Sequence, residues 1–425
     1  MSSILIKKAT IIDPNSAQNN KVRDIHIENG IVKNIQTKIE LSGKGHTIIS
    51  EKNLHVCPGL MDFSVDFSEP GDEQKETIIS GCKAALAGGF TAVGVQPTNT
   101  PARDNKSAIK FTINSAAELG IKVIPYGALS KGLKGEQLSE MYDMYNAGAL
   151  AFTDFLKPVQ HSGLLSRALL YAKNFNGMII SFPYDNTISP NGQMHEGETS
   201  TLLGLEGIPS LTEELYVDRD IAINKYNEGR LHFNIISSKN SVDSIAKAKK
   251  DKDEISCGTS IYHLIFDDKM LEGFNKDFKT LPPLRSSEER NALLEAVKNG
   301  TIDVITSNHQ PHEKEITEVE FAIAPFGVIG TQIAFPLALT YLQDYIGLEG
   351  IVQSMSINPR TVLQTEVAII KEGHPADITL FNPTAEWEFN KENNVSLSEN
   401  TPIMGTKLTG KVIGTILKNK YHSNI

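Results

Sequence analysis

The chain has 425 residues, of which 40% are hydrophobic, and this length and composition support a globular fold with a sizeable core. Its 41 lysines and arginines are outnumbered by 51 aspartates and glutamates, and the net charge of −10, with no basic tail or stripe, excludes nucleic acid as an expected partner. The N-terminus has no secretory signal pattern, and no later run approaches about eighteen uninterrupted apolar residues. We therefore expect a cytoplasmic protein without a membrane span.

Three cysteines, Cys57, Cys82 and Cys257, are scattered along the chain without a paired motif. Such spacing cannot build a disulfide framework, so we expect buried thiols in a reducing compartment. Cys257 and Ser260 lie near the end of an expected strand, but no motif places a histidine base beside them. A new nucleophile is therefore not expected.

Short strand patterns occupy residues 3–52. They read "SILIKKATIID", "VRDIHIENGIVKNIQ" and "GHTIIS". In the second of these, Asn29-Gly30 is a hairpin signal. We expect a small β unit.

From about residue 54 the pattern changes to strand, turn and amphipathic helix, repeated along the chain. Strands are expected at "HVCPGLMDFSV", "FTAVGVQ", "KVIPYG", "LAFTDF", "GMIISF", "LHFNIIS", "EISCGTS" and "DVITSN". Among the helical stretches, "SSEERNALLEAVKNG" has Ser286 placed to cap it, with Glu289 three positions on. Eight strands alternating with helices predict an α/β fold, a (β/α)8 TIM-type barrel over residues 54–365.

After residue 365 the chain returns to short strand patterns, "VAIIKEGHPADITLFNP" and "GTKLTGKVIGTILKNK". Neither end of the chain by itself could bury much core. We therefore expect residues 1–53 and 366–425 to pair into one small β-sandwich beside the barrel.

The first barrel strand ends in an alternation that places Asp62, Ser64 and Asp66 on one face. Active sites of this kind of barrel stand at the carboxyl ends of the strands. The geometry would suit a metal site, yet this stretch contains no histidine.

Several motifs, in the same order and at the same intervals, resemble those of the dihydroorotase family of the amidohydrolase superfamily. "PGLMDFSVDFSEPG" is similar to PGLIDxHxHxREPG, "AGGFTAVGVQPTNTP" to AGGFTTVxxMPNTNP, and "HEGETSTLLGLEGIP" to NEGExSxxLGLxGIP. "LPPLRSSEER" is similar to NPPLRSxxDR, "IDVITSNHQPHEKEITEVEFAIAPFGVIGTQ" to IDxIATDHAPHxxxEKxxxFxxAPFGxxGLE, and "HPADITLF" to GxDADLTLF. The similarity runs nearly end to end and is to the longer type of dihydroorotase, which is found with aspartate transcarbamoylase.

The resemblance implies reversible closure of N-carbamoyl-aspartate to dihydroorotate, in pyrimidine biosynthesis, at a zinc centre. Zinc lowers the pKa of its bound water from 15.7 to roughly 7, which is worth on the order of 12 kcal/mol. In this chain the family's first two histidine ligands fall on Ser64 and Asp66, and the next two fall on Phe182 and Ile235. The strand-eight aspartate, ligand and general base in the family, falls on Asn308, which cannot accept a proton at neutral pH.

The substrate contacts that the resemblance implies have changed as well. The arginine that would clamp a carboxylate falls on Ser68, the asparagine of MPNT on Thr98, and the asparagine of NPPLR on Leu281. One strand-four aspartate is kept as Asp154, and which of the family's two aspartates it matches stays open. His312 matches the family's substrate-contacting histidine.

The polar residues that remain allow two interpretations. His309 and His312 are expected to be relics or hydrogen-bonded pocket residues, because no third nitrogen or sulfur ligand is assignable. Asp62, Asp66 and Asp154 could hold Mg2+ or Ca2+ through oxygen. We favour the alternative, in which Asp62 makes a structural hydrogen bond and the other two are solvated.

Four apolar residues occupy formerly polar positions, Phe155, Phe182, Ile235 and Leu281. They indicate a pocket partly filled by side chains, either as a collapsed core, which we favour, or as a new apolar binding surface.

The sequence therefore predicts a pseudoenzyme of the dihydroorotase family, with no zinc or other cofactor and no intact catalytic residue. The expected role is that of a structural or regulatory protein partner, for example of aspartate transcarbamoylase, in a homo-oligomer. One alternative is an active dihydroorotase or cyclic-amide hydrolase with a rebuilt metal site. Another is a small-molecule sensor.

Overall fold

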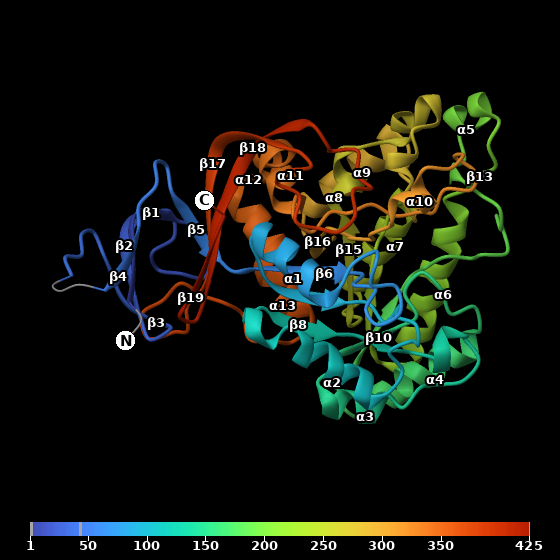
Figure 1. Cartoon of the computed structure of the whole chain (residues 1–425). Helices are drawn as coiled ribbons and strands as arrows, with labels where there is room; N and C mark the ends of the chain where they lie inside the picture. Colours follow the sequence, from blue (N-terminus) through green and yellow to red (C-terminus); the bar gives the residue numbers. More distant parts are fainter. Residues whose placement is uncertain (1–2, 42–44, 425) are drawn as a thin grey trace.

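Strands from both ends of the chain form one sheet beside an α/β barrel in the computed structural model, which describes residues 3–41 and 45–424 (Figure 1). The sheet order is β19-β18-β17-β5-β1-β2-β3, and β4 pairs with β1. Its strands are β1 Ser3–Ile11, β2 Val22–Glu28, β3 Ile31–Gln36, β4 His46–Ile49, β5 His55–Pro58, β17 Asp377–Phe389, β18 Thr406–Leu417 and β19 Lys420–Ser423. The expected pairing of the two chain ends is confirmed, because β5 joins β1 to β17.

The sheet buries a core of its own. Ile6 and Ile25 from the N-terminal strands pack in the same apolar cluster as Ile378 and Ile416 from the C-terminal strands. Each end thus supplies part of a core that neither could bury alone. The hairpin signal at Asn29-Gly30 is also confirmed, since both residues have positive φ, at 51° and 79°, in the turn between β2 and β3.

The strands expected for the barrel are all present and pair in parallel. They are β6 Leu60–Val65, β7 Phe90–Val95, β8 Lys122–Pro125, β9 Gly127–Ala128, β10 Ala151–Thr153, β11 Met178–Ser181, β14 Arg230–Phe233, β15 Ile255–Ser260 and β16 Val304–Thr306. They run as β6-β7-β8 and as β16-β15-β14-β11-β10-β9, with Tyr126 between β8 and β9. A bridge between Val65 and His309 joins the first strand to the chain just after the last.

Two expected strands are divided, 122–127 at Tyr126 within the barrel and 55–65 between two sheets. The stretch 55–65 forms β5 in the terminal sheet and β6 in the barrel. The division falls at Pro58-Gly59, where proline has no N–H for a ladder and where a Cβ on Gly59 would lie 1.8 Å from Asp377 Oδ1. The close approach lets the Gly59 N–H donate to the Asp377 carbonyl at 2.9 Å.

Helices surround the barrel and cover its ends. They are α1 Ile78–Ala87, α2 Lys106–Ser115, α3 Met141–Ala147, α4 Ser162–Lys173, α5 Glu198–Leu203, α6 Leu211–Asn227, α7 Lys239–Lys250, α8 Ile261–Ile265, α9 Ser287–Lys298, α10 Lys314–Thr317, α11 Ala334–Tyr341, α12 Gln343–Val352 and α13 Asn358–Val362. A short parallel pair, β12 Met194–His195 and β13 Gly207–Ile208, flanks α5. Ser286 caps α9 as expected, because its side chain accepts from the Glu289 N–H.

Within the described residues, none of the helices has the length and apolar character that a membrane crossing requires. Cys57, Cys82 and Cys257 are free and buried, which confirms the expected buried thiols. Burial raises the pKa of all three thiols, so none is activated as a nucleophile.

Arg360 in α13 joins the barrel to the terminal sheet. It is 3% exposed, and its guanidinium donates to the Gly59 carbonyl at 2.6 Å, to Thr91 Oγ1 at 3.1 Å and to Asp377 Oδ2 at 3.1 Å. These acceptors belong to the start of the barrel and to β17. One cation therefore satisfies buried oxygens from both parts of the fold.

Replacing this cation should destabilise the fold. We expect Arg360→Met to lower the free energy of unfolding by about 2–4 kcal/mol, because it leaves buried acceptors without a donor. Urea denaturation measures the loss. Lys371→Met, at an exposed site just before β17, is the matched control. A value for Arg360→Met within about 0.5 kcal/mol of wild type would contradict this role.

Candidate functional site

The mouth of the barrel, at the carboxyl ends of its strands, carries the polar residues that the sequence singled out. Ser64 is fully buried there, and its Oγ accepts hydrogen bonds from Gln96 Nε2 at 2.9 Å and from Asn234 Nδ2 at 3.2 Å. Gln96 follows β7 and Asn234 follows β14. A neutral hydroxyl held by two amides thus occupies the position at which the resemblance places the first histidine.

Asp62 has a structural role, as expected. Its Oδ1 accepts from Thr306 Oγ1 at 2.6 Å and from the Ser307 N–H at 3.0 Å. The Ser64 N–H donates in turn to Thr306 Oγ1 at 3.0 Å. The carboxylate thereby links the first barrel strand to the last.

Asp154 is buried, so the expectation that it is solvated is wrong, whereas Asp66 is half-buried. Asp66 Oδ1 accepts from Thr98 Oγ1 at 2.5 Å, and burial raises the pKa of Asp66. Asp154 is 3% exposed and accepts from both the N–H, at 2.9 Å, and the Oγ of Ser130. Each carboxylate faces inward because a neighbouring strand end supplies a hydroxyl donor to it.

The three carboxylates do not form one site. Asp62, Asp66 and Asp154 are each bound to different neutral donors, and residues 3–41 and 45–424 contain no group of three or more His, Cys, Asp or Glu side chains placed to hold a metal. The arrangement therefore does not favour the Mg2+ or Ca2+ alternative.

His309 and His312 are hydrogen-bonded residues, as expected. His309 Nδ1 accepts from the Gly330 N–H at 3.1 Å, and its Nε2 lies 3.4 Å from Glu76 Oε2 in a pair that is almost fully buried. His312 Nε2 donates to the Phe326 carbonyl at 2.8 Å, and burial lowers the pKa of His312. Each imidazole thus has one ring nitrogen bonded to the backbone, while His309 Nε2 and His312 Nδ1 have no hydrogen-bond partner among the described residues.

Apolar side chains fill the remainder of the mouth. The apolar plug comprises Phe182, Tyr184 and Ile208, with Leu156, Leu281 and Phe326 packed against them. The rings of Phe182 and Tyr184 stack with centroids 5.9 Å apart. The cavity left between Asp154 and Phe182 is only about 10 Å3, room for about one water molecule. This packing supports a collapsed core.

The other predicted positions are also buried. Ser68 is 7% exposed, Ile235 beside Asn234 is 1% exposed, and Asn308 is 2% exposed. Asn308 adopts a φ of 51°, a conformation that asparagine tolerates better than most residues. Its Oδ1 has no partner among the described residues.

Lys279 is a buried cation that the sequence analysis missed. Its Nζ donates at 2.7 Å to Gln193 Oε1 and to the carbonyls of Phe321 and Ala324, and burial lowers the pKa of Lys279 to about 8. It lies 4.7 Å from the Phe326 ring centroid and so holds the loops over the apolar plug. A single lysine in an irregular segment has no sequence pattern that could have identified it.

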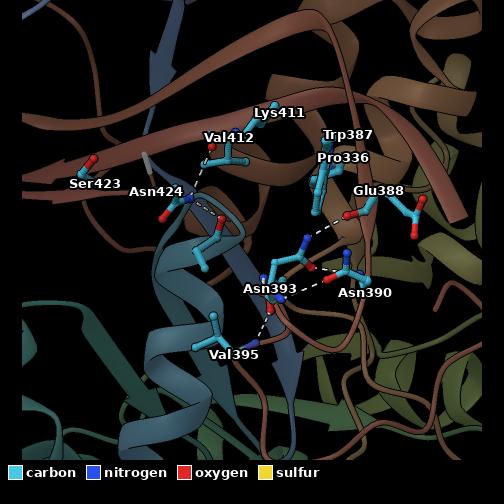
Figure 2. A pocket seen from close by; sticks show the side chains of 12 residues that line it. Pro336, Trp387, Glu388, Asn390, Asn393, Val395, Lys411, Val412, Ser423 and Asn424 are labelled. Carbon is cyan, nitrogen blue, oxygen red and sulfur yellow. Dashed lines mark hydrogen bonds between the residues drawn. The ribbon is translucent and has the colours of Figure 1, made fainter. Parts of the chain in front are cut away.

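A larger cavity, about 610 Å3, lies under the β17–β18 hairpin, where Trp387, Pro336 and Val395 line it (Figure 2). Asn393 Nδ2 donates to the Glu388 carbonyl at 2.7 Å, and Asn424 Nδ2 donates to the Ala87 carbonyl at 2.7 Å. These amides hold the surrounding chain segments. Among the described lining residues, none belongs to the predicted site.

The buried carboxyl of Asp154 predicts a pH dependence of stability. Burial raises its pKa from 3.8 to about 6, against the hydrogen bonds from Ser130. Because the pKa of Asp154 is higher in the folded state than in the unfolded state, its ionised form destabilises the fold. The full penalty applies above about pH 6 and disappears as the pH falls towards 3.8.

Asp154→Asn removes that penalty while it keeps an acceptor for Ser130. Relative to wild type, the variant should gain about 1–2 kcal/mol in free energy of unfolding between pH 5 and pH 8. Urea denaturation at both pH values measures this gain. Asp218→Asn, at an exposed position on α6, should show no such gain, and parallel pH profiles for Asp154→Asn and wild type would refute the assignment.

Comparisons with known proteins agree with this architecture. The family model described as Dihydro-orotase-like matches residues 54–241, and the one described as Amidohydrolase family matches residues 236–420. The hydantoinase (dihydropyrimidinase) of Arthrobacter aurescens has the same fold, with a TM-score of 0.88, 20% identity, and coverage of 100% of this chain and 96% of its own.

Curated relatives are more similar in sequence. A dihydroorotase of Acetivibrio thermocellus is 38% identical over 417 residues, 97% of each chain. A dihydroorotase of Aquifex aeolicus is 36% identical over 425 residues, 99% of each chain. These full-length similarities show that the chain belongs to the dihydroorotase family of the amidohydrolase superfamily.

Proposed function

We propose that this chain is a non-catalytic dihydroorotase homologue that acts as a structural or regulatory partner in pyrimidine biosynthesis. The proposal rests on which side chains at the mouth could act as metal ligands. Zinc sites are built from imidazole, thiolate and carboxylate ligands, usually three plus an open position in a catalytic centre. Ser64, Phe182, Ile235 and Asn308 supply none of these, so the residues present do not fit the family's zinc.

The surroundings of the mouth support the same proposal. Asp66, the carboxylate at a first-strand ligand position implied by the resemblance, is held by Thr98, and His312, which matches the family's substrate-contacting histidine, is bound to the Phe326 carbonyl. The apolar plug occupies the space that a substrate would need. No residue is placed to clamp a substrate carboxylate where Ser68 and Leu281 stand.

An active dihydroorotase with a rebuilt site is the second candidate. Its support is the full-length similarity of about 35–38% identity to proteins named dihydroorotase, which favours a shared activity over the non-catalytic role. The two candidates differ in metal content and in turnover. A small-molecule sensor that uses the altered pocket of the mouth is not favoured, because the cavity measured beside the plug is about 10 Å3.

Metal content and turnover decide between the two candidates. The purified protein should contain no stoichiometric zinc by elemental analysis and should not hydrolyse dihydroorotate. Stoichiometric zinc, together with a hydrolysis that a chelator abolishes, would replace the proposal with the rebuilt-site enzyme.

Partial repair of the site should also fail. Ser64→His with Asp66→His restores two nitrogen ligands. Phe182 and Ile235 still supply no metal ligand, and Asn308 still supplies no base. Because residues of one catalytic unit act non-additively, turnover of dihydroorotate by the double variant should stay at the background rate. Measurable turnover by this variant would show that the mouth keeps more of the machinery than we propose.

The proposed partner is aspartate transcarbamoylase, by analogy with the longer family type. The chain and the aspartate transcarbamoylase of the same organism, mixed at micromolar concentrations, should elute as one complex in size-exclusion chromatography with light scattering. The chain alone should elute as a homo-oligomer. Separate elution of the two proteins would reject this partner and leave the non-catalytic assignment to the metal and turnover measurements.

A further inference from the structure

A second cavity, the basal pocket, opens at the amino ends of the barrel strands, on the face opposite to the mouth. It measures about 400 Å3 and lies between β8, α13, the chain that leads into β17, and the turn from β18 to β19 (Figure 1). Its lining includes Lys122, Arg360, Glu366, Ile369 and Lys418. The volume is in the range of small-molecule sites.

The basal pocket gathers three cations from distant parts of the chain. Arg360 is buried and committed to Asp377 and to backbone oxygens, as described above. Lys122 begins β8, and Lys418 lies in the turn between β18 and β19. Within the described residues, neither lysine Nζ has a hydrogen bond or an ion pair. Two positive charges thus line the cavity together with the carboxylates of Asp377 and Glu366, which attract Lys122 without an ion pair.

Lys122 is in an environment that favours an added negative charge. Its side chain is exposed over part of its surface, yet burial and the nearby Arg360 guanidinium lower the pKa of Lys122, against Asp377 and Glu366. A bound anion would offset both the lost hydration and the repulsion from Arg360. Glu366, exposed at the edge of the pocket, would oppose that anion.

One wall of the basal pocket is apolar. Val367, Ile369 and Leu417 are half-buried along it. The backbone of residues 367–369 has no regular secondary structure and makes no hydrogen bond to any other described residue, so its N–H groups have no protein acceptor there. Cations beside an apolar wall are the features that recognise an anion with an apolar body.

We propose that the basal pocket binds a small organic anion, a carboxylate or a phosphate monoester, with its charged group between Lys122 and Lys418 and its apolar body against Ile369 and Leu417. This site is remote from the barrel mouth. Anion binding in the basal pocket does not depend on whether the mouth binds metal, so this proposal does not rest on the proposed function.

Calorimetric titration of the full chain tests the basal pocket. Phenyl phosphate and benzoate are the probes, and benzyl alcohol, which has the ring without the charge, is the neutral control. We expect saturable binding of at least one anion, weakened by added salt, and no binding of the alcohol. The ratio of the two affinities identifies the preferred head group. No saturable binding of either anion, or equal binding of the alcohol, would overturn the proposal.

Variants assign the binding to this pocket. Lys122→Met should weaken binding of the anion by about tenfold or more, because one charge-assisted hydrogen bond is lost. Glu366→Gln should tighten binding by about two- to fivefold, because it removes an exposed repulsive charge. Lys83→Met, on the exposed face of α1, is the matched control and should bind as wild type does. Wild-type affinity in Lys122→Met, in a protein with unchanged circular dichroism, would overturn the assignment.

Discussion

Closure of the barrel depends on the buried carboxylate of Asp62. It accepts from Thr306 Oγ1 and from the Ser307 N–H, and it thereby joins the first strand to the last. A parallel barrel brings the carboxyl ends of all its strands to one face, so this closure also places Ser64 beside Gln96 and Asn234. The residues of the mouth meet only because the two edges of the barrel meet.

The mouth combines hydrogen-bonded polar side chains with packed apolar ones. Ser64 stands between two amides, and the apolar plug packs Phe182 against Tyr184. Buried carboxylates are costly without donors, and Asp66 and Asp154 each have a hydroxyl donor. Lys279 binds three oxygens of the covering loops and closes the surface above the plug.

The opposite face differs in its chemistry. Arg360 is satisfied by Asp377 and by backbone oxygens, and it keeps the barrel and the terminal sheet together. Lys122 and Lys418 remain without partners among the described residues, beside a cavity of about 400 Å3. The mouth also keeps buried polar atoms without a hydrogen-bond partner among the described residues, such as Gln96 Oε1, Asn234 Oδ1 and Asn308 Oδ1, but these are neutral amide oxygens, whereas the two lysines are cations. A fold can lose a site at one end and still present charged groups at the other.

The sequence by itself determined what depends on local pattern and on residue type. The strand-helix alternation, the hairpin at Asn29-Gly30 and the cap at Ser286 follow from local backbone preferences, and the absence of histidine from residues 59–78 follows from the residues present. Only the tertiary structure decided that Asp154 is buried and Asp66 half-buried, that Lys279 is a buried cation, and that stretch 55–65 divides between two sheets. Those outcomes depend on which distant residues meet, as Lys279 meets the Phe321 and Ala324 carbonyls, and no local pattern records such contacts.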